Sequence, residues 1–274
     1  MPNHPGADFG TRGHPSRVSR GEENGVLRNH PRLSFDPRNL GAPLLLWTRA
    51  DMGIGFNGST ISGWDDISGN GRDFAQSTAS KQPSLRSGQG GRVSIKWDGS
   101  DDMAGVDLYA SLTDKDDWTI VVVGGGWTWG DSADPWYTRG MLGAPSGGAS
   151  YFEVSVTNEA GGGLVMAYWD ATGSAHRSAY GDDSQAEGDP FILVGISNGT
   201  AFQLAVNGTL GSAVTTVSGL ASGATTLEVG RGNGNLNSWD GSISEMLIFD
   251  GALSTEDREG LEVYLSDRYS ISRS

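Results

Sequence analysis

Two Asn-Gly dipeptides, nine residues apart, constrain the fold of this chain more than any other feature. Asn198-Gly199 follows the apolar run 191–197, and Asn207-Gly208 follows the apolar run 202–206. Asn and Gly tolerate the positive φ angles of a type I′ turn, whose twist matches that of paired antiparallel strands. The segment 191–217 therefore predicts a three-stranded antiparallel meander joined by two such turns.

Apolar residues elsewhere also recur at every second position or in short runs, the pattern of β-strands. Phe152, Val154 and Val156 alternate with Glu153, Ser155 and Thr157. Further strands are expected at 117–123, 164–169, 227–229 and 243–249. The 43 glycines suit the turns and bulges that many short strands need.

One segment, at the C-terminal end, has helical spacing. Ser254 can cap a helix, with Asp257 three residues later, and apolar residues follow at intervals of three and four, among them Leu261 and Leu265. We therefore predict an all-β, antiparallel two-sheet β-sandwich with one short C-terminal helix.

Charge divides the chain into an arm and a body. Residues 1–40 contain six Arg and four acidic residues, which leaves 13 basic and 29 acidic side chains in the rest of the 274 residues, a balance of −16. The arm also holds five of the ten prolines and little that could be buried, so it is not expected to fold alone. We expect an extended basic arm over 1–42 and a folded domain over 43–274. The arm would dock on an assembly through Arg12, Arg17, Arg20, Arg28, Arg32 and Arg38.

Several classes of protein are disfavoured by composition. The acidic body argues against nucleic acid as a main partner, because phosphate binding needs clustered Lys and Arg. No apolar run is long enough to span a bilayer, and the first residues do not form a signal peptide. Without cysteine there is no disulfide framework, thiolate metal site or cysteine nucleophile.

Two segments near the start of the body resemble laminin-G-like jelly rolls of the concanavalin A-like lectin/glucanase superfamily. They are 44–51 (LLLWTRAD) and 64–74 (WDDISGNGRDF). The later segments 206–208, 227–230 and 241–249 resemble the closing strands of that fold, and 252–265 its terminal helix. The resemblance covers residues 43–271 and implies a jelly-roll sandwich. Versions with the W-x-D-x-S-G-N-G-R stretch resemble bacteriophage tail and capsid-surface proteins, although the superfamily also includes lectins, adhesion modules and glycosidases.

The motifs that would indicate catalysis do not fit their context. A glucanase of this superfamily would carry Glu-x-Asp-x-Glu along one strand face, and the sequence has no such string. Residues 195–199 fit Gly-x-Ser-x-Gly but lead into another strand, and residues 53–58 fit Gly-x-Gly-x-x-Gly without a following helix. We predict that the chain is not an enzyme. Hydrolysis lost on substitution of Glu153 or Glu245 would contradict this prediction.

Two groups of residues are candidates for ligand contact. Asp98, Asp101 and Asp102 cluster in a loop and are the first candidates for a structural Ca²⁺, with a solvated acidic turn as the alternative. No other cofactor is expected. Trp127, Trp129, Trp136 and Tyr137 lie among Gly, Asp and Pro, which predicts a loop. Exposed aromatic residues in a loop contact glycans or neighbouring subunits, the alternative being that they cover the local core.

Together these features predict a non-enzymatic phage virion protein, a capsid decoration (cement) or tail accessory protein located on the virion surface and made in the host cytoplasm. Its arm would bind the major capsid or tail proteins, and we expect a homo-oligomer, often a trimer in proteins of this kind. The alternative is a carbohydrate-binding or host-adhesion module that holds a host-surface glycan with the aromatic loop. The two readings are compatible.

Overall fold

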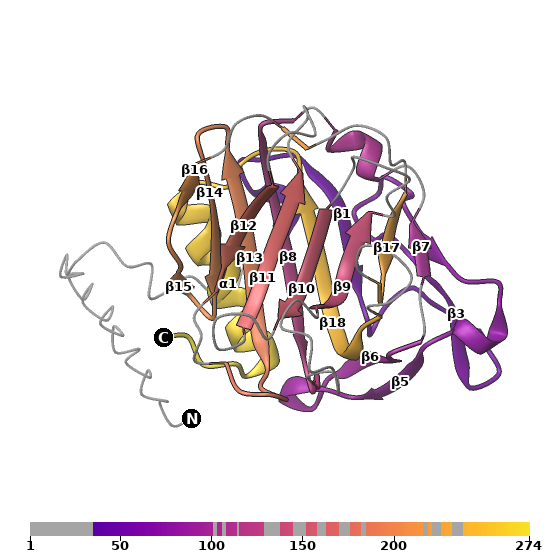
Figure 1. Cartoon of the computed structure of the whole chain (residues 1–274). Coiled ribbons are helices and arrows are strands. Elements are labelled where there is room, and N and C mark those ends of the chain that lie inside the picture. The colour runs from indigo at the N-terminus through magenta and orange to yellow at the C-terminus, as the bar shows by residue number, and fades with distance from the viewer. Residues whose placement is uncertain are drawn as a thin grey trace, which may run out of the picture. The chain divides into compact units, whose positions relative to one another are not determined.

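The fold was analysed in a computed structural model of the 274-residue chain. The structure describes residues 35–100, 103–105, 108–113, 115–128, 138–144, 152–157, 163–169, 176–181, 185–215, 219–220, 226–231 and 238–274. Residues from Asp36 to Ser274 form one compact unit (Figure 1). No helix in these described ranges is long and apolar enough to cross a membrane.

Seven antiparallel strands form one layer, here called the front sheet. Their order is β4 (Phe74–Ala75), β7 (Met103–Gly105), β17 (Leu227–Val229), β9 (Thr138–Ala144), β10 (Phe152–Thr157), β11 (Gly163–Trp169) and β12 (His176–Tyr180). Strands β9 to β12 lie nearest the viewer in Figure 1.

The second layer, here called the back sheet, is built around the longest strand, β18 (Asp240–Phe249). On one side β18 pairs with β8 (Asp117–Gly125), followed by β13 (Phe191–Asn198) and β14 (Ala201–Val206). Strand β14 also pairs with β15 (Thr209–Leu210) and β16 (Val214–Thr215). The other side of β18 pairs with β1 (Leu44–Arg49) and β6 (Val93–Asp98), and β6 leads to β5 (Ser84–Ser87), β3 (Thr60–Trp64) and β2 (Ile54–Asn57). Because β3 pairs with both β5 and β4, it joins the two sheets.

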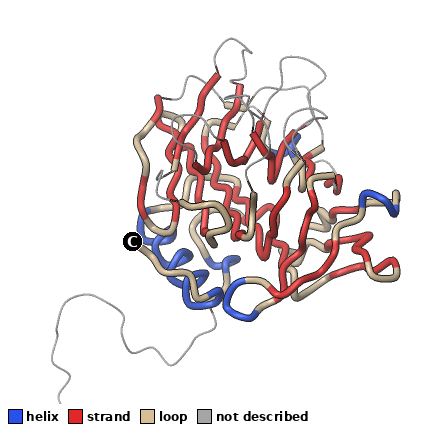
Figure 2. The backbone as a smooth tube through the Cα atoms, turned by 60° about the horizontal axis from the view of Figure 1, so that its bottom comes forward, coloured by secondary structure: helices blue, strands red, loops and turns tan. Residues whose placement is uncertain are grey.

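Helix α1 (Thr255–Tyr269) packs on the outer face of the back sheet. The Ser254 side chain accepts a hydrogen bond from the Asp257 backbone N–H at 3.1 Å, so the predicted cap is confirmed. Leu261, Leu265 and Tyr269 are buried on the helix, and Tyr269 reaches Glu245 of β18. Figure 2 shows the helix near the C-terminus, along the outer side of the strands. Four 3₁₀ turns complete the described elements: Pro37–Asn39, Ala79–Lys81, Gln89–Gly91 and Tyr109–Ser111.

Aromatic rings hold the two sheets together. Trp118 of β8 lies 5.4 Å from Phe202 of β14, and both face rings of the front sheet. The Trp118 ring is 6.2 Å from Phe152 and 6.0 Å from Tyr168, each in an edge-on arrangement. Such edge-to-face pairs add stabilisation beyond the apolar area that they bury. The tryptophans assigned to packing from the sequence are all buried, which confirms that assignment: Trp47, Trp64, Trp97, Trp118 and Trp239.

The meander predicted from the Asn-Gly pairs is present as β13, β14 and β15, but only one turn has the expected form. At Asn207-Gly208 both residues have positive φ, 48° and 91°, as a type I′ turn requires. At Asn198-Gly199 only the glycine does. The Asn198 Oδ1 instead accepts hydrogen bonds from the backbone N–H groups of Thr200 and Ala201. Side-chain capping of the turn therefore replaces the second type I′ conformation, and that detail of the prediction was wrong.

Side chains of the W-x-D-x-S-G-N-G-R stretch form hydrogen bonds with the backbone of strand β1. The Asp66 carboxylate accepts hydrogen bonds from the backbone N–H groups of Trp47 at 3.0 Å and Ser68 at 2.8 Å. Asn70 Nδ2 donates to the Leu44 carbonyl oxygen and Arg72 Nη1 to the Leu45 carbonyl oxygen, at 2.8 and 2.9 Å. These bonds satisfy backbone groups along the edge of β1, which would otherwise offer a template for another strand.

Candidate functional site

The outward face of the front sheet, turned away from the back sheet, carries mainly small and polar residues, together with Val165 and Tyr180. Phe152, Val154 and Val156 of β10 point into the core, so Glu153, Ser155 and Thr157 point the other way. Helix α1 lies on the far side of the molecule, behind these strands in Figure 1. Helix α1 does not cover this outward face, yet Glu153, Ser155 and Thr157 are only 1–2 % exposed, so the middle of the face is buried.

One row of register partners crosses all seven strands of this face. Glu228 of β17 pairs with Gly143 of β9, and Gly143 pairs with Glu153 of β10. Directly paired residues of antiparallel strands share a face. The complete row is Ala75, Ala104, Glu228, Gly143, Glu153, Ala167 and Ser178. Apart from the two glutamates it contains only alanine, glycine and serine.

The glycine in this row separates the two carboxylates. Strands lie about 4.8 Å apart, so the Cα atoms of Glu228 and Glu153, two strands apart, are separated by roughly 10 Å. Glycine within a strand often marks a place where a ligand approaches the backbone closely. We call the seven-residue row, together with Tyr180, the front groove; the name denotes a row of register positions and not an open cleft, because Glu153 and Ala167 in its middle are 1 % and 5 % exposed.

Tyr180 belongs to the neighbouring row on the same face, where it pairs with Val165, which in turn pairs with Ser155. Its side chain is 40 % exposed. Glu228 is 18 % exposed, whereas Glu153 in the middle is only 1 % exposed. A ligand could therefore contact Tyr180 at one end of the front groove and Glu228 toward the other, whereas Glu153 between them is buried.

Charges around the front groove are paired or turned away from it. The Arg231 guanidinium lies 3.5 Å from a Glu228 carboxylate oxygen. Arg139 aligns with the core-facing Val156, and its Nη1 lies 3.9 Å from an Asp240 carboxylate oxygen on β18.

Asp240, in strand β18 of the back sheet, forms ion pairs with Lys96 and Arg139. Partial burial by itself would raise the pKa of this carboxyl, but hydrogen bonds from Lys96 and Thr128 and the charge of Arg139 outweigh burial and hold the pKa below its usual value. Asp240 stays ionised at neutral pH and retains Arg139 on its side of the molecule.

This arrangement suits a ligand with an apolar ring face and several hydroxyl groups. A tyrosine ring offers a flat surface for stacking, and its hydroxyl tolerates contact with water. The Glu228 carboxylate, which is 18 % exposed, can accept hydrogen bonds from ligand hydroxyls.

The predicted aromatic loop is only partly within the described residues. The Trp127 ring is 1 % exposed, and its Nε1 donates to the Asp189 carbonyl oxygen at 3.2 Å, so Trp127 belongs to the core and not to a contact surface. The expectation was wrong for this residue because the chain returns to the core directly after β8. Trp129, Trp136 and Tyr137 lie outside the described residues, and their contact role stays a prediction.

The arm is likewise mostly outside the described residues. Arg12, Arg17, Arg20, Arg28 and Arg32 fall there. Arg38 is described: its guanidinium forms an ion pair with Asp36 at 2.9 Å and lies 5.6 Å from the centre of the Trp47 ring. Arg38 therefore contacts the folded unit itself, through a cation–π interaction.

The predicted metal site is represented by Asp98 alone, since Asp101 and Asp102 lie outside the described residues. One Asp98 carboxylate oxygen accepts hydrogen bonds from the backbone N–H and the hydroxyl of Ser100, at 2.9 and 2.7 Å. Among the residues that the structure describes, no three acidic or histidine side chains are grouped to hold a metal ion. Calcium binding stays untested.

Glu245, the second residue named for a test of hydrolysis, lies on the opposite face from Glu153. It is fully buried beneath α1, where it accepts hydrogen bonds from Trp47 Nε1 at 2.7 Å and the Tyr269 hydroxyl at 2.8 Å. A carboxylate so enclosed holds the helix on the sheet. It is not placed to meet a polysaccharide.

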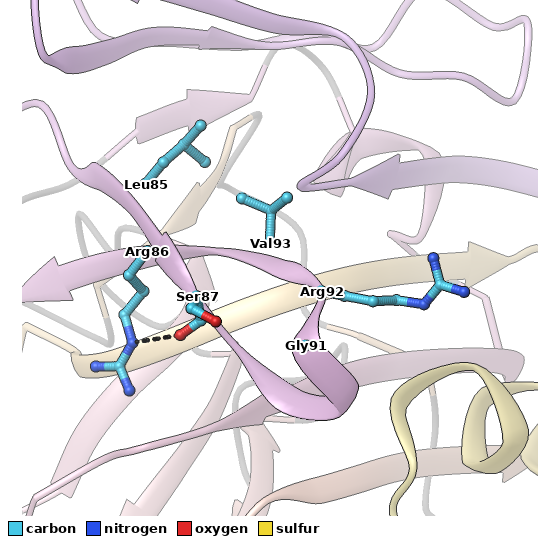
Figure 3. Close-up of a pocket in the computed structure, with 6 residues that line it drawn as sticks. All are labelled: Leu85, Arg86, Ser87, Gly91, Arg92 and Val93. Atoms are coloured by element: carbon cyan, nitrogen blue, oxygen red, sulfur yellow. Dashed lines mark hydrogen bonds between the residues drawn. The ribbon is translucent and has the colours of Figure 1, made fainter.

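A concavity of about 350 Å³ lies on the hairpin of β5 and β6. It is lined by Leu85, Arg86, Ser87, Gly91, Arg92 and Val93 (Figure 3). The two arginines extend in opposite directions, and Arg92 Nε donates to the Arg268 carbonyl oxygen at the end of α1. The arginines do not converge on one point, so we do not assign this hollow as a site.

Comparison with known families identifies the class of protein. Residues 127–257 match the laminin-G-like family described as the concanavalin A-like lectin/glucanases superfamily. Residues 127–257 are thus similar to this superfamily, and the body has the jelly-roll fold that the sequence resemblance implied. Comparison with curated protein sequences finds no match.

Solved structures with the same fold include sugar-binding and catalytic proteins. Domain 4 of AbnA, an extracellular arabinanase of Geobacillus stearothermophilus solved with arabinotriose, is 14 % identical with a TM-score of 0.59, and the match covers 81 % of this chain and 98 % of that domain. The ligand-binding domain of botulinum neurotoxin serotype D, solved with N-acetylneuraminic acid, is also 14 % identical, with a TM-score of 0.60 over 83 % of this chain and 52 % of that one. Trypanosoma rangeli sialidase matches at 13 % identity and a TM-score of 0.54, over 82 % of this chain and 33 % of the enzyme. This chain therefore spans about half of the toxin domain and a third of the sialidase, and at these identities the likeness shows the fold.

Proposed function

We propose that the protein is a carbohydrate-binding module that holds a glycan in the front groove. The observation that carries this proposal is the row of small residues interrupted by Glu228 and Glu153, with the exposed Tyr180 ring on the same face. A sugar ring would stack on Tyr180, and a longer oligosaccharide would reach the Glu228 carboxylate, which lies four strands away at about 4.8 Å per strand.

Two further features support a binding role. The arabinanase domain that matches over nearly its whole length was solved with a bound arabinotriose. In addition, the front groove is formed by strands of one sheet rather than by separate domains, so its register is fixed before a ligand arrives. A preorganised site binds with a smaller entropic cost.

We also propose that binding proceeds without hydrolysis. Glu153 is enclosed, Glu228 has an arginine beside it, and Glu256 and Glu259 project into solvent from α1. Incubation with β-glucans and arabinans should release no reducing ends. Repeatable hydrolysis that is lost in Glu153→Gln or Glu228→Gln would contradict this part of the proposal, with Glu245→Gln as the variant of a carboxylate on the other face.

The binding proposal is tested by screening the full chain on an array of neutral and sialylated oligosaccharides. The strongest glycan is then titrated calorimetrically against wild type, Tyr180→Ala and Val263→Ala. Val263 is an exposed apolar residue of α1 on the other side of the molecule, so its substitution is the matched control. We expect Tyr180→Ala alone to weaken binding. Absence of any bound glycan, or equal binding by all three proteins, would contradict the proposal.

A second candidate role is that of a phage virion protein on the virion surface, with the arm as its anchor. It is favoured by the basic, proline-rich residues 1–40 in front of a body whose balance of charge is −16. Deletion of residues 1–34 should leave the body folded but abolish its incorporation into the assembly, and this truncation keeps Arg38 on Trp47. Normal incorporation of the truncated protein would contradict the anchor role.

The aromatic loop gives this candidate a separate test. Replacement of Trp129 and Trp136 by Ala should weaken glycan binding or association between copies of the chain, by about 2 kcal/mol per anchor, with folding stability nearly unchanged. A loss of several kcal/mol of folding stability with intact binding would place the two rings in the core.

A further inference from the structure

We propose that two copies of this chain pair through strand β2, edge to edge and antiparallel, so that their back sheets become continuous. This surface is not used by the proposed carbohydrate-binding function. Among the described residues, β2 pairs with β3 and with no other strand. Strand β3 lies on the side of the molecule away from β14 and β16 (Figure 1). The free edge of β2 is therefore a template on which a further strand can pair.

The backbone groups of two residues face this free edge. In the register pair Phe56–Ile61, the Ile61 N–H donates to the Pro83 carbonyl oxygen at 2.8 Å, away from β2. Phe56 and Ile61 are therefore a non-hydrogen-bonded pair, whose N–H and C=O groups point away from each other. The Gly53 carbonyl oxygen accepts a hydrogen bond at 2.7 Å from the N–H of the residue after β3, so Gly53 faces β3. Because these directions alternate along a strand, Ile54 and Phe56 direct their N–H and C=O groups to the free edge.

The side chains of the same two residues are apolar. Phe56 is 59 % exposed, and Ile54 is partly buried against the core. They lie two positions apart and so share one face of β2. A two-fold axis through Gly55 would place Ile54 of each copy opposite Phe56 of the other, with both pairs hydrogen-bonded. Each exposed ring would then pack on an aliphatic side chain, a cross-strand pair that stabilises antiparallel strands.

Charge favours a second copy as the occupant of this edge. The chain has a net charge of −14, so contacts between most parts of two copies would bring acidic surfaces together. Residues 52–64 are an uncharged run of 13 residues between Asp51 and Asp65, and β2 lies within this run. Two copies can meet there without opposing like charges. The pairing occupies the free edge of both β2 strands, so the assembly closes as a dimer.

Sedimentation equilibrium of the full chain at physiological salt tests the association. Strand β2 has only four residues, so we expect a small interface and a dissociation constant of about 0.1 mM. Phe56→Asp places a charge opposite Ile54 of the second copy and should weaken association about tenfold or more. Val263→Asp makes the same change of charge at an exposed residue of α1 and should change association by less than about twofold.

Amide hydrogen exchange of the unmodified chain, resolved by residue, tests the register. The Ile54 and Phe56 amides should gain protection as the protein concentration rises, in proportion to the fraction of dimer. The Asn57 amide faces β3 in the single copy and is the internal control, since its protection should not depend on concentration.

Three results would overturn the proposal. The first is a monomer at every concentration up to about 0.5 mM, five times the expected dissociation constant. The second is a dimer that Phe56→Asp and Val263→Asp weaken equally, because this would show a general effect of charge. The third is concentration-dependent protection that avoids Ile54 and Phe56 and appears on another surface. None of these results bears on the binding of a glycan at Tyr180, so the two proposals are tested separately.

Discussion

The outer faces of the two sheets are built differently, although the inner faces of both sheets contribute apolar residues to the core. In β8 and β13 of the back sheet the outward positions are also apolar, among them Val121, Val123, Ile192 and Val194, and helix α1 covers them. In β10 of the front sheet the outward positions are Glu153, Ser155 and Thr157.

The two faces differ in the chemistry of their outward side chains, although Glu153, Ser155 and Thr157 are themselves only 1–2 % exposed, and we assign ligand contact to the exposed Tyr180. A sheet with two apolar faces must bury both, and α1 supplies the second cover. A face of small and polar residues gains little from such a cover. Substitutions behind α1 should therefore change folding, and substitutions in the front groove should change binding.

The largest effect is expected for Leu265→Ala on the buried side of α1. Removing this fully buried side chain leaves a cavity against the back sheet and should lower the free energy of unfolding by about 3 kcal/mol. Val263→Ala on the exposed side of the same helix should change it by less than about 0.5 kcal/mol. Urea unfolding measures both. Equal effects for the two variants would contradict the assignment of α1 as a cover.

A smaller loss is expected for Glu245→Gln, also behind α1. The substitution keeps the size of the side chain but removes the charge that accepts hydrogen bonds from Trp47 and Tyr269 and lies 3.3 Å from Arg268. We expect about 2 kcal/mol of destabilisation, with unchanged glycan affinity. Unfolding experiments and titration with the array glycan check the two parts. A loss of glycan affinity with unchanged stability would reverse the roles of the two faces.

On the front sheet, Tyr180→Ala should do the opposite. Loss of one stacking ring should weaken glycan binding about tenfold, or about 1.4 kcal/mol, and change the free energy of unfolding by less than about 0.5 kcal/mol. Calorimetric titration and urea unfolding of the same sample separate the two effects. If stability falls by several kcal/mol while affinity stays constant, Tyr180 is a packing residue.

The smallest effect is expected for the pH dependence of the free energy of unfolding, which depends on two carboxyl groups close to Arg268 of α1, those of Asp51 and Glu245. Partial burial would raise the pKa of Asp51, but hydrogen bonds and charge from Arg49 and Arg268 hold it below its usual value. Its contribution to stability is present above the unfolded-state pKa of about 3.9 and is lost as the pH falls through the folded-state pKa. Burial raises the pKa of Glu245, so its contribution has the opposite sign and grows as the pH falls through the folded-state pKa toward about 4.3.

Asp51→Asn should therefore flatten the acid loss of stability, and Glu245→Gln should steepen it. Unfolding curves between pH 6 and pH 2 measure the two slopes, with Glu259→Gln as a variant of an exposed carboxylate on α1. If both substitutions change the slope in the same direction, the direction assigned to one of the two pKa shifts is wrong.

Much of the fold could be predicted from local patterns, whereas the groove could not. Alternation in 152–157, the Asn207-Gly208 turn and the Ser254 cap each depend on residues close together in the chain, and the structure confirms them. Glu228 and Glu153 lie 75 positions apart in the sequence, and only the register through Gly143 places them in one row. The alternation in β10 did predict that Glu153 points to the face of the strand opposite to Phe152 and Val154. Burial of Trp127 was missed because a tryptophan beside glycines has the same sequence signature in a loop and in a turn that re-enters the core.

The difference between the two outer faces is tested most directly by mapping backbone amide shifts by NMR during titration with the best glycan of the array. We expect shifts that saturate with ligand at Ser178, Tyr180, Gly143 and Glu228, and none along α1. Shifts concentrated on α1 and its neighbours, with the front groove unchanged, would contradict the assignment of the front sheet as the binding face.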